Sequence, residues 1–277
     1  YGTMQAMRTL RKIKPSLVFS KGGFVSVPVV VAAKLSNIPV VIHESDITPG
    51  LANKIAAPFA EHIFTVFEET LKYIPRDKSS AIGAIIRPDL FQGDEKIARE
   101  LTGFSPFKET IIVMGGSQGS KSINAAIKDN IDTLTKRFQI IHLCGKGNLD
   151  PSLIDKPNYK AFEYVTDELP HLLKITNYVI SRAGSNSIFE FLELKKPMLL
   201  IPLSKNASRG DQVLNANFFE KLGYAIVLEE EGLTAETFMN SLSALALNKE
   251  KIIDAQCLAS SSKTPEQFTE LLLTYKN

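Results

Sequence analysis

The stretch IIVMGGSQGSKSINAAI, residues 111–127, decides the fold, because an apolar run ends there in a cluster of glycines and a helix begins. The four apolar residues 111–114 are typical of a strand buried in a parallel sheet. Gly115, Gly116 and Gly119 then let the backbone approach a ligand without Cβ clashes. Because the start of the following helix offers N–H groups and a positive dipole, the stretch predicts an α/β fold with a phosphate-binding turn.

A second turn of the same kind occurs in YVISRAGSNSIFEFLEL, residues 178–194. Ser185, Asn186 and Ser187 lie where its helix is expected to begin, and Glu190 stands three residues after Ser187. This spacing is typical of a capping box. The functional alternative is that the Glu190 carboxylate accepts both hydroxyls of a ribose whose phosphates rest on the turn. Two such turns in one half of a chain predict a site for a nucleotide diphosphate.

The first turn, GGSQGS, presents Ser117 and Gln118 between its glycines and matches neither GxxxxGK[ST] nor GxGxxG. ATP hydrolysis and NAD binding are therefore disfavoured. A tight strand-to-helix turn without a ligand is the structural alternative. The polar segment PLSKNASRGDQVLNAN, residues 202–217, follows another apolar run. Its Asp211 and Gln212 are candidates for hydrogen bonds to sugar hydroxyls, or else for a polar cap and a solvated turn.

The composition sets limits on the class of protein. A chain of 277 residues is long enough for two domains, each with its own core. Its 32 Lys and Arg against 30 Asp and Glu give a net charge of +2, which is no argument for nucleic acid binding. Cys144 and Cys257 are too few for a disulfide framework. No apolar stretch reaches the roughly 20 residues that span a bilayer, so we expect a cytoplasmic protein.

Strands and helices alternate along the chain, which predicts two doubly wound, Rossmann-like domains facing each other across a cleft. We expect one domain over residues 1–86, a second over 87–256, and a C-terminal helix within 257–277 that packs back on the first. In such sheets ligands bind beyond the carboxyl ends of the strands, where every glycine-rich turn lies. Strands are expected near residues 17–20, 40–42, 62–66, 110–114, 138–143, 159–163, 177–181, 197–201 and 224–228.

Further candidates for chemistry lie outside the two turns. His43, Glu44 and Asp46 end a strand on the cleft side, although a lone histidine at such a place is more often structural. Arg87 either braces the domain joint or neutralises a diphosphate. The remaining histidines have no metal-ligand spacing with each other or with the cysteines, so no metal site is expected: His62, His142 and His171.

The first residues combine basic and apolar side chains, namely Arg8, Arg11, Lys12 and Lys14 with Met4, Met7 and Leu10. Such a face could lie on anionic lipid headgroups, at about 1 kcal/mol per basic residue. The alternative is a solvated helix in front of a buried strand. Because this helix-like segment has no strand before it, we expect that an upstream part of the domain is missing.

The chain resembles the MurG family of peptidoglycan synthesis in seven runs that occur in the same order: KGGFVSVP, PVVIHESDITPGLANKIAA, IGAIIRPDLF, GGSQGSKSIN, EYVTDELPHLL, SRAGSNSIFE and SRGDQVLNAN. These enzymes are undecaprenyldiphospho-muramoylpentapeptide β-N-acetylglucosaminyltransferases. The resemblance implies a GT-B fold, UDP-N-acetylglucosamine as donor, and lipid I, a lipid-linked muramoyl-pentapeptide, as acceptor. It also implies an inverting transfer that forms lipid II without a metal, by a peripheral protein on the cytoplasmic face of the membrane.

Carried over residue by residue, the resemblance implies the following roles. Ser117 and Arg87 bind the donor diphosphate, residues 185–190 bind the nucleoside with Glu190 on the ribose, a backbone group near Val165 or Thr166 reads the uracil, and Gln212 binds the sugar. Two positions depart from the pattern. Asp46 stands where many members have Asn, and Asp211 stands where others have a second Gln, so contacts there change from a neutral amide to an acceptor.

The family's first glycine-rich loop, which is GGTGGH-like, has no counterpart in this sequence. The resemblance therefore implies a truncated enzyme, with an incomplete acceptor domain over 1–86 and a UDP-sugar domain over 87–256. Alternatives are a UDP-sugar-binding module without turnover, a glycolipid synthase of the same superfamily and a UDP-N-acetylglucosamine 2-epimerase. A two-domain solute-binding protein is disfavoured because no export signal is visible.

Overall fold

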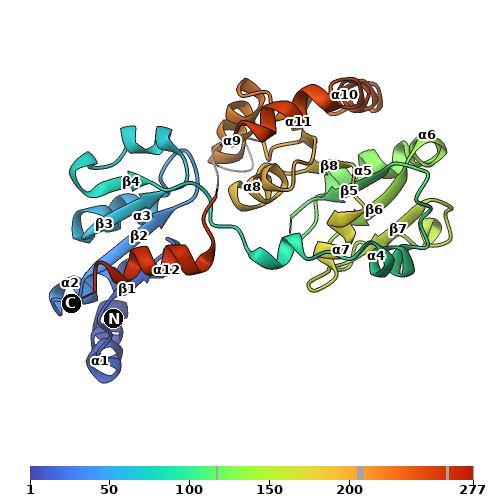
Figure 1. Ribbon diagram of the computed structural model, residues 1–277. Helices are drawn as coiled ribbons and strands as arrows, with labels where there is room; N and C mark the ends of the chain where they lie inside the picture. The colour runs from blue at the N-terminus through green and yellow to red at the C-terminus, as the bar shows by residue number, and fades with distance from the viewer. Residues whose placement is uncertain (117, 205–208, 260–261, 277) are drawn as a thin grey trace. The chain divides into compact units, whose positions relative to one another are not determined.

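The computed structural model describes residues 1–116, 118–204, 209–259 and 262–276 (Figure 1). The chain divides into two compact units. Unit 1 comprises Tyr1–Arg87 together with the C-terminal segment from Ser260, and unit 2 comprises Pro88–Ala259. The first division falls one residue after the expected 86/87. The return to unit 1 comes after Ala259, because α11 (Lys249–Cys257) still belongs to unit 2, whereas we expected the return at 257.

Unit 1 is built on a parallel sheet in the order β1-β2-β3-β4. Its strands are β1 (Val18–Ser20), β2 (Val40–Glu44), β3 (His62–Thr65) and β4 (Ser79–Ala81). Its helices are α1 (Gly2–Ile13), α2 (Ser26–Leu35), α3 (Leu51–Ala56), α12 (Pro265–Leu273) and the 3-10 turns η1 (Ala57–Phe59), η2 (Glu68–Lys72) and η3 (Arg76–Lys78). The short polar β4, sequence SSA, lacks the apolar signal of a strand and was not expected from the sequence; it is formed by pairing with β3.

The two faces of this sheet are covered by different parts of the chain. Val40 and Ile42 pack with residues of α1, α2 and α3 in one core cluster. Val41, which points to the opposite face by the alternation of a strand, packs with Phe64 and with Phe268 of α12. Figure 1 shows α12, in red, beside the blue strands of unit 1. The C-terminal helix thus completes the core of unit 1.

Unit 2 is built on a parallel sheet in the order β10-β9-β8-β5-β6-β7. Its strands are β5 (Thr110–Met114), β6 (Gln139–Leu143), β7 (Tyr159–Phe162), β8 (Tyr178–Ser181), β9 (Met198–Leu200) and β10 (Ala225–Val227). The chain builds outward from β5 to β7, then returns to the other side of β5 with β8. A topological switch point therefore lies between β5 and β8, where doubly wound sheets bind their ligands.

Helices alternate with the strands of unit 2. They are α4 (Glu95–Thr102), α5 (Lys121–Asp129), α6 (Ile131–Arg137), α7 (Leu169–Lys174), α8 (Ser185–Glu193), α9 (Asp211–Lys221), α10 (Ala235–Leu247), α11 and the 3-10 turns η4 (Pro88–Phe91), η5 (Pro151–Leu153) and η6 (Glu230–Gly232). Ile111, Val113 and Ile140 of the sheet share a core cluster with residues of α5, α6, α10 and α11. These packed apolar side chains hold the strand ends of unit 2 in place.

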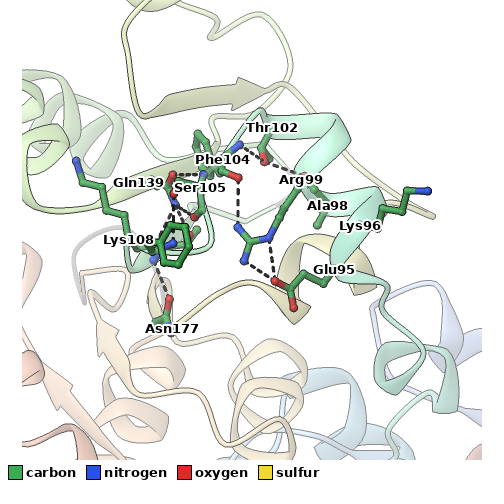
Figure 2. A network of polar contacts seen from close by, with 12 residues as sticks. Glu95, Lys96, Ala98, Arg99, Thr102, Phe104, Ser105, Lys108, Gln139 and Asn177 are labelled. Carbon is green, nitrogen blue, oxygen red and sulfur yellow. Dashed lines mark hydrogen bonds and ion pairs between the residues drawn. The ribbon is translucent and has the colours of Figure 1, made fainter.

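A polar network fixes the start of this sheet (Figure 2). The amide of Gln139, the first residue of β6, donates to the carbonyls of Ser105 and Lys108 at 3.0 and 2.9 Å and accepts from the Ser105 N–H at 2.6 Å. Arg99 of α4 donates to the Phe104 carbonyl at 3.2 Å and to Glu95. The segment between α4 and β5 is thereby tied to the amino ends of the strands, opposite the glycine-rich turns.

Candidate active site

The first glycine-rich turn follows β5 at the switch point, and its geometry requires glycine. A Cβ on Gly115 would lie 2.4 Å from the Ser120 nitrogen. Gly119 has a φ of 76°, and a Cβ there would lie 2.0 Å from the Cys144 carbonyl oxygen. The Gly119 N–H donates to the Gly116 carbonyl at 3.0 Å, which closes the turn. Ser117 lies outside the described residues, and the neighbouring Gln118 is exposed.

The two helices that start at the switch point differ in their caps. Ser120 is the N-cap of α5, and its hydroxyl accepts from the Ile123 N–H at 3.4 Å. The N-cap of α8 is Gly184, which has no side chain and hence makes no side-chain cap. The helix begins at Ser185, within the expected 185–187, and the alternative of a capping box at Ser187 and Glu190 is wrong, because both residues lie within the helix. The start of α8 keeps the N–H groups that favour an anion.

An ion pair connects the carboxyl ends of the strands around the switch point. Arg182, directly after β8, contacts Glu230 of η6 with an Nη2–Oε1 distance of 2.5 Å. The same nitrogen donates to the hydroxyls of Ser120 and Ser122 at 2.8 and 3.1 Å. Only 11% of the Arg182 side chain and 19% of the Glu230 side chain are exposed. This pair was not singled out from the sequence.

The far side of the first turn is held by a buried histidine. His142 of β6 contacts the Tyr159 hydroxyl through Nδ1 at 2.8 Å and the Asn124 Oδ1 through Nε2 at 2.9 Å. The Asn124 amide then donates to the Cys144 carbonyl at 2.9 Å. Burial lowers the pKa of His142 to about 4, so its imidazole is neutral at neutral pH. Its role is structural, since it fixes α5 against the turn that follows β6.

The predicted binding residues of unit 2 occupy several exits of the same sheet edge. Asn186 is exposed and Glu190 is half-buried, both on α8. Gln212, in the first turn of α9, accepts from the Leu203 N–H at 3.0 Å and so closes the loop after β9. Thr166 follows β7; its N–H donates to Glu168 at 3.0 Å and its carbonyl accepts from the Leu169 N–H. Two further predicted residues lie on α8: Ser185 is its buried first residue, and Ser187 is half-buried.

At the carboxyl edge of unit 1, Glu44 is a structural anchor. Its Oε1 accepts from the Asp46 N–H at 3.1 Å, and its Oε2 accepts from the Gly50 N–H at 2.9 Å and the Asn53 amide at 2.8 Å. Both carboxylate oxygens are therefore used to shape the loop between β2 and α3. Asp46 itself is half-buried, and its carbonyl accepts from the Thr70 hydroxyl at 3.1 Å.

His43 lies beside Glu44 with 2% of its surface exposed. Its ring packs edge-on against Phe268 and Phe19, with centroid distances of 5.6 and 6.5 Å. Burial, together with the charge of Lys21, lowers the pKa of His43 to about 3. A neutral imidazole with so low a pKa is a weak proton acceptor at neutral pH. The surroundings of His43 therefore favour a structural role.

Other expectations concern Arg87, metals and membranes. Arg87 is the exposed last residue of the first segment of unit 1. Within the described parts of the chain, no group of three or more His, Cys, Asp or Glu side chains is placed to hold a metal ion. None of the helices in those parts combines the length and the apolar character of a membrane span.

Three residues that support the site were not identified from the sequence, in which their signals are weak: Arg182, Glu230 and His142. Arg182 is a charged residue directly after an apolar strand, which could have marked it as a strand-end group. Glu230 stands in the acidic run EEEG, where nothing separates it from its exposed neighbours. His142 stands inside an apolar run. Its structural role is recognisable only from its hydrogen-bond partners, Asn124 of α5 and Tyr159 of β7.

Comparisons with known proteins agree with this geometry. The C-terminal domain of glycosyltransferase family 28 matches residues 110–270, and its N-terminal domain matches residues 1–65. The UDP-N-acetylglucosamine--N-acetylmuramyl-(pentapeptide) pyrophosphoryl-undecaprenol N-acetylglucosamine transferase of Clostridium botulinum is 53% identical over 272 residues, which are 98% of this chain and 76% of the relative. The enzyme of the same name from Clostridium tetani is 50% identical over 274 residues, 99% of this chain and 76% of the relative.

Solved structures show the same fold. The crystal structure of Acinetobacter baumannii MurG aligns with a TM-score of 0.76 at 22% identity, over 98% of this chain and 77% of that one. A UDP-GlcNAc 2-epimerase from Neisseria meningitidis aligns with a TM-score of 0.70 at 15% identity, over 99% and 80%. The expected GT-B fold of two Rossmann-like domains is confirmed. The chain therefore belongs to glycosyltransferase family 28 and, within it, to the UDP-N-acetylglucosamine--N-acetylmuramyl-(pentapeptide) pyrophosphoryl-undecaprenol N-acetylglucosamine transferases.

Proposed function

We propose that this chain transfers N-acetylglucosamine from UDP-N-acetylglucosamine to the lipid-linked muramyl-pentapeptide named in its relatives, a step of peptidoglycan synthesis. One observation carries the donor assignment. Two glycine-rich turns leave the neighbouring strands β5 and β8 at the switch point of unit 2. Parallel strands place their carboxyl ends at one edge, so both turns present helix starts to the same ligand.

The diphosphate is assigned to the starts of α5 and α8. The turn after β5 brings main-chain N–H groups close because its glycines carry no Cβ. The start of α8 has no side-chain cap, so its N–H groups and positive dipole favour the negative diphosphate. We assign charge neutralisation to these groups and to Arg87, with no metal ion required. They would stabilise the charge that develops on departing UDP.

The nucleoside and the sugar are assigned to the neighbouring exits of unit 2. Glu190 lies on the second turn of α8, where its carboxylate would accept both hydroxyls of the ribose. The segment at Val165 and Thr166 follows β7, two strands from β5, or about 10 Å along the sheet, and is assigned to the uracil. The loop closed by Gln212 follows β9 and is assigned to the N-acetylglucosamine.

The reaction is proposed to invert the anomeric centre. The 4-hydroxyl of the acceptor sugar attacks the anomeric carbon, the bond from that carbon to the diphosphate breaks, and a base takes the hydroxyl proton. The low pKa of His43 argues against this residue as the base. The hydrogen bonds on both oxygens of Glu44 argue for a structural role there.

Unit 1 is proposed to approach the anionic inner surface of the membrane through α1. Arg8, Arg11, Lys12 and Lys14 are exposed, whereas Leu10 is buried and packs with α2 and α3 in the core of unit 1. The apolar side of α1 is therefore partly used by the core. The exposed basic residues are free of the core and are proposed to contact lipid headgroups. Met4, which is 58% exposed, is proposed to contact the apolar edge of the membrane surface.

Titration calorimetry with UDP-N-acetylglucosamine tests the donor assignment. Glu190→Ala is expected to weaken binding about 30-fold or more, because a charged acceptor of two hydroxyls is lost. Glu236→Gln, an exposed carboxylate on α10, is the control and should bind like the unchanged chain. Equal affinity of Glu190→Ala would remove the ribose assignment.

A second assay separates the transferase from its alternatives. UDP release is measured with the lipid-linked acceptor present, and UDP-glucose and UDP-galactose compete for the site. The proposal expects acceptor-dependent UDP release and preference for the N-acetylglucosamine donor. Binding without release would restrict the chain to a donor-binding role, and preference for UDP-glucose or UDP-galactose would favour a glycolipid synthase.

A further inference from the structure

We infer that Glu230 is a positioning residue for the donor site. Its carboxylate fixes the relative positions of three strand exits of unit 2 and does not contact the donor. This inference rests on the proposed function, because it concerns the exits assigned to the diphosphate and the sugar. Glu230 lies in the 3-10 turn η6, after the edge strand β10. No motif of the sequence pointed to it.

The two oxygens of Glu230 contact different exits. Oε1 accepts from Arg182, directly after β8, at 2.5 Å and from the hydroxyl of Ser122 in the first turn of α5. Oε2 accepts from the Ser204 N–H, in the segment after β9, at 3.2 Å. The exits of β5, β8 and β9 are thus joined through a single side chain.

Arg182 extends these connections. Its Nη1 donates to the carbonyls of Ile201 and Pro202, each at 3.1 Å, and its Nη2 donates to Ser120, the N-cap of α5. Both terminal nitrogens are therefore engaged by protein oxygens. The guanidinium thus connects the segment after β9 to the start of α5, and the Glu230 carboxylate neutralises its charge.

The surroundings make this pair sensitive to change. Both side chains are mostly buried, and removing one partner of such a pair leaves a charge without compensation. Burial raises the pKa of Glu230, but hydrogen bonds from Arg182, Ser122 and the Ser204 N–H outweigh it, so the pKa is lowered overall. The carboxylate is therefore charged at neutral pH, as its pairing with Arg182 requires.

The consequence is a mechanical coupling of the diphosphate turns to the sugar loop. If Glu230 is removed, Arg182 loses its counter-charge, Ser122 loses its acceptor and the Ser204 N–H loses its partner. The start of α5 and the segment after β9 are then connected only through Arg182, which has lost its counter-charge, so their relative positions vary more. Donor binding weakens although no group that touches the donor has changed. The KM for the acceptor stays the same.

Three variants of the full chain test this inference: Glu230→Ala, Glu230→Gln and, as a matched control, Glu231→Gln at the exposed neighbour. Glu230→Ala should raise the donor Kd and KM about 30-fold, with the acceptor KM unchanged. Glu230→Gln should raise them about 5-fold, because an amide offers one acceptor oxygen instead of two. Glu231→Gln should match the unchanged chain. Without donor, amide hydrogen exchange at 118–124 and 203–204 should rise in Glu230→Ala.

The outcomes separate this inference from the proposed function. If the unchanged chain binds UDP-N-acetylglucosamine and folded Glu230→Gln binds it equally well, the positioning role is wrong and the donor site stands. The positioning role is also wrong if donor and acceptor KM rise together, since that indicates general destabilisation. If the unchanged chain binds no UDP-sugar, both proposals fail. Should Glu230→Ala not fold, Glu230→Gln decides.

Discussion

The carboxyl edges of the two sheets carry similar residues but differ in whether the buried polar atoms of those residues have hydrogen-bond partners. His142 at the end of β6 and His43 at the end of β2 are 3% and 2% exposed. Both ring nitrogens of His142 have hydrogen-bond partners. Among the described residues, the buried Nε2 of His43 and Oδ1 of Asn53 have none. At its carboxyl edge unit 2 thus satisfies its buried histidine, whereas unit 1 leaves these two atoms without protein partners in the described part of the chain. The unpartnered Oε1 of Gln256 in unit 2 lies at the opposite, amino edge, where its amide donates to the Lys196 and Tyr224 carbonyls.

The difference indicates which of the two edges has a fixed geometry before a ligand binds. Unpartnered buried polar groups are costly, so an edge without them keeps one geometry before a ligand arrives. The edge of unit 2, braced by Arg182 and His142, fits a preformed donor site. The edge of unit 1 is held by Glu44 and packed by α12, but it contains the unpartnered Nε2 of His43 and Oδ1 of Asn53.

The largest expected effect comes from adding one methyl group to each edge. Gly119→Ala combines a positive φ with a Cβ 2.0 Å from a carbonyl oxygen, and should lower the free energy of unfolding by about 4 kcal/mol. Gly23→Ala in unit 1 has a φ of 82° but open space, and should cost about 1 kcal/mol. Urea unfolding followed by circular dichroism measures both. Equal costs would show that the first turn is not tightly packed.

The pH dependence should reflect the neutral histidines. The pKa of His142 falls from 6.5 in the unfolded chain to about 4 in the fold. The unfolded state therefore binds the extra proton, and the stabilisation is complete above pH 6.5 and lost as the pH falls to 4. The expected loss is about 3 kcal/mol, and His43 adds a loss in the same direction. His142→Leu should reduce the slope of the curve between pH 6.5 and 4, where the contribution of His43 remains; an unchanged slope would contradict this origin.

At pH 7 the same substitution at both edges should have unequal costs. His142→Leu leaves the buried Tyr159 hydroxyl and the half-buried Asn124 without their partner and should cost about 2 to 3 kcal/mol. His43→Leu removes an unpartnered nitrogen among aromatic rings and should stay within about 1 kcal/mol of the unchanged chain. Chemical unfolding at pH 7 compares them. A larger cost for His43→Leu would reverse the comparison between the units.

The smallest effects concern the helix caps. Thr234 of α10 in unit 2 and Thr264 of α12 in unit 1 each form a capping box. Alanine at either position should cost about 1 kcal/mol. Hydrogen exchange should rise locally, in α10 for Thr234→Ala and in α12 for Thr264→Ala. Faster exchange in both units from a single substitution would show that the two cores do not respond separately.

Much of the fold could be predicted, because apolar strands and glycine-rich turns are local signals. Every predicted strand of unit 2 is present, and the turns follow β5 and β8 as expected. The short β4 could not be predicted, since SSA becomes a strand only by pairing with β3. The start of α8 at Ser185 agrees with the expectation, but the capping-box spacing of Ser187 and Glu190 is misleading, because the turn at Gly184 places both residues inside the helix.

The supports of the site were not predictable, because they depend on contacts between distant segments. Arg182 and Glu230 are 48 residues apart, and His142 and Asn124 are 18 apart. Neither pair has a spacing rule, unlike a cap or a phosphate loop. Local sequence thus indicated which turns could bind a ligand, whereas the tertiary structure reveals what holds them in position.

The proposed function depends above all on donor binding at the switch point of unit 2. Amide hydrogen exchange with and without saturating UDP-N-acetylglucosamine tests it most directly. We expect exchange to slow at least about tenfold at residues 114–122 and 182–190 and to stay the same at residues 43–53. Protection confined to residues 43–53, or unchanged exchange at both turns despite bound donor, would contradict it.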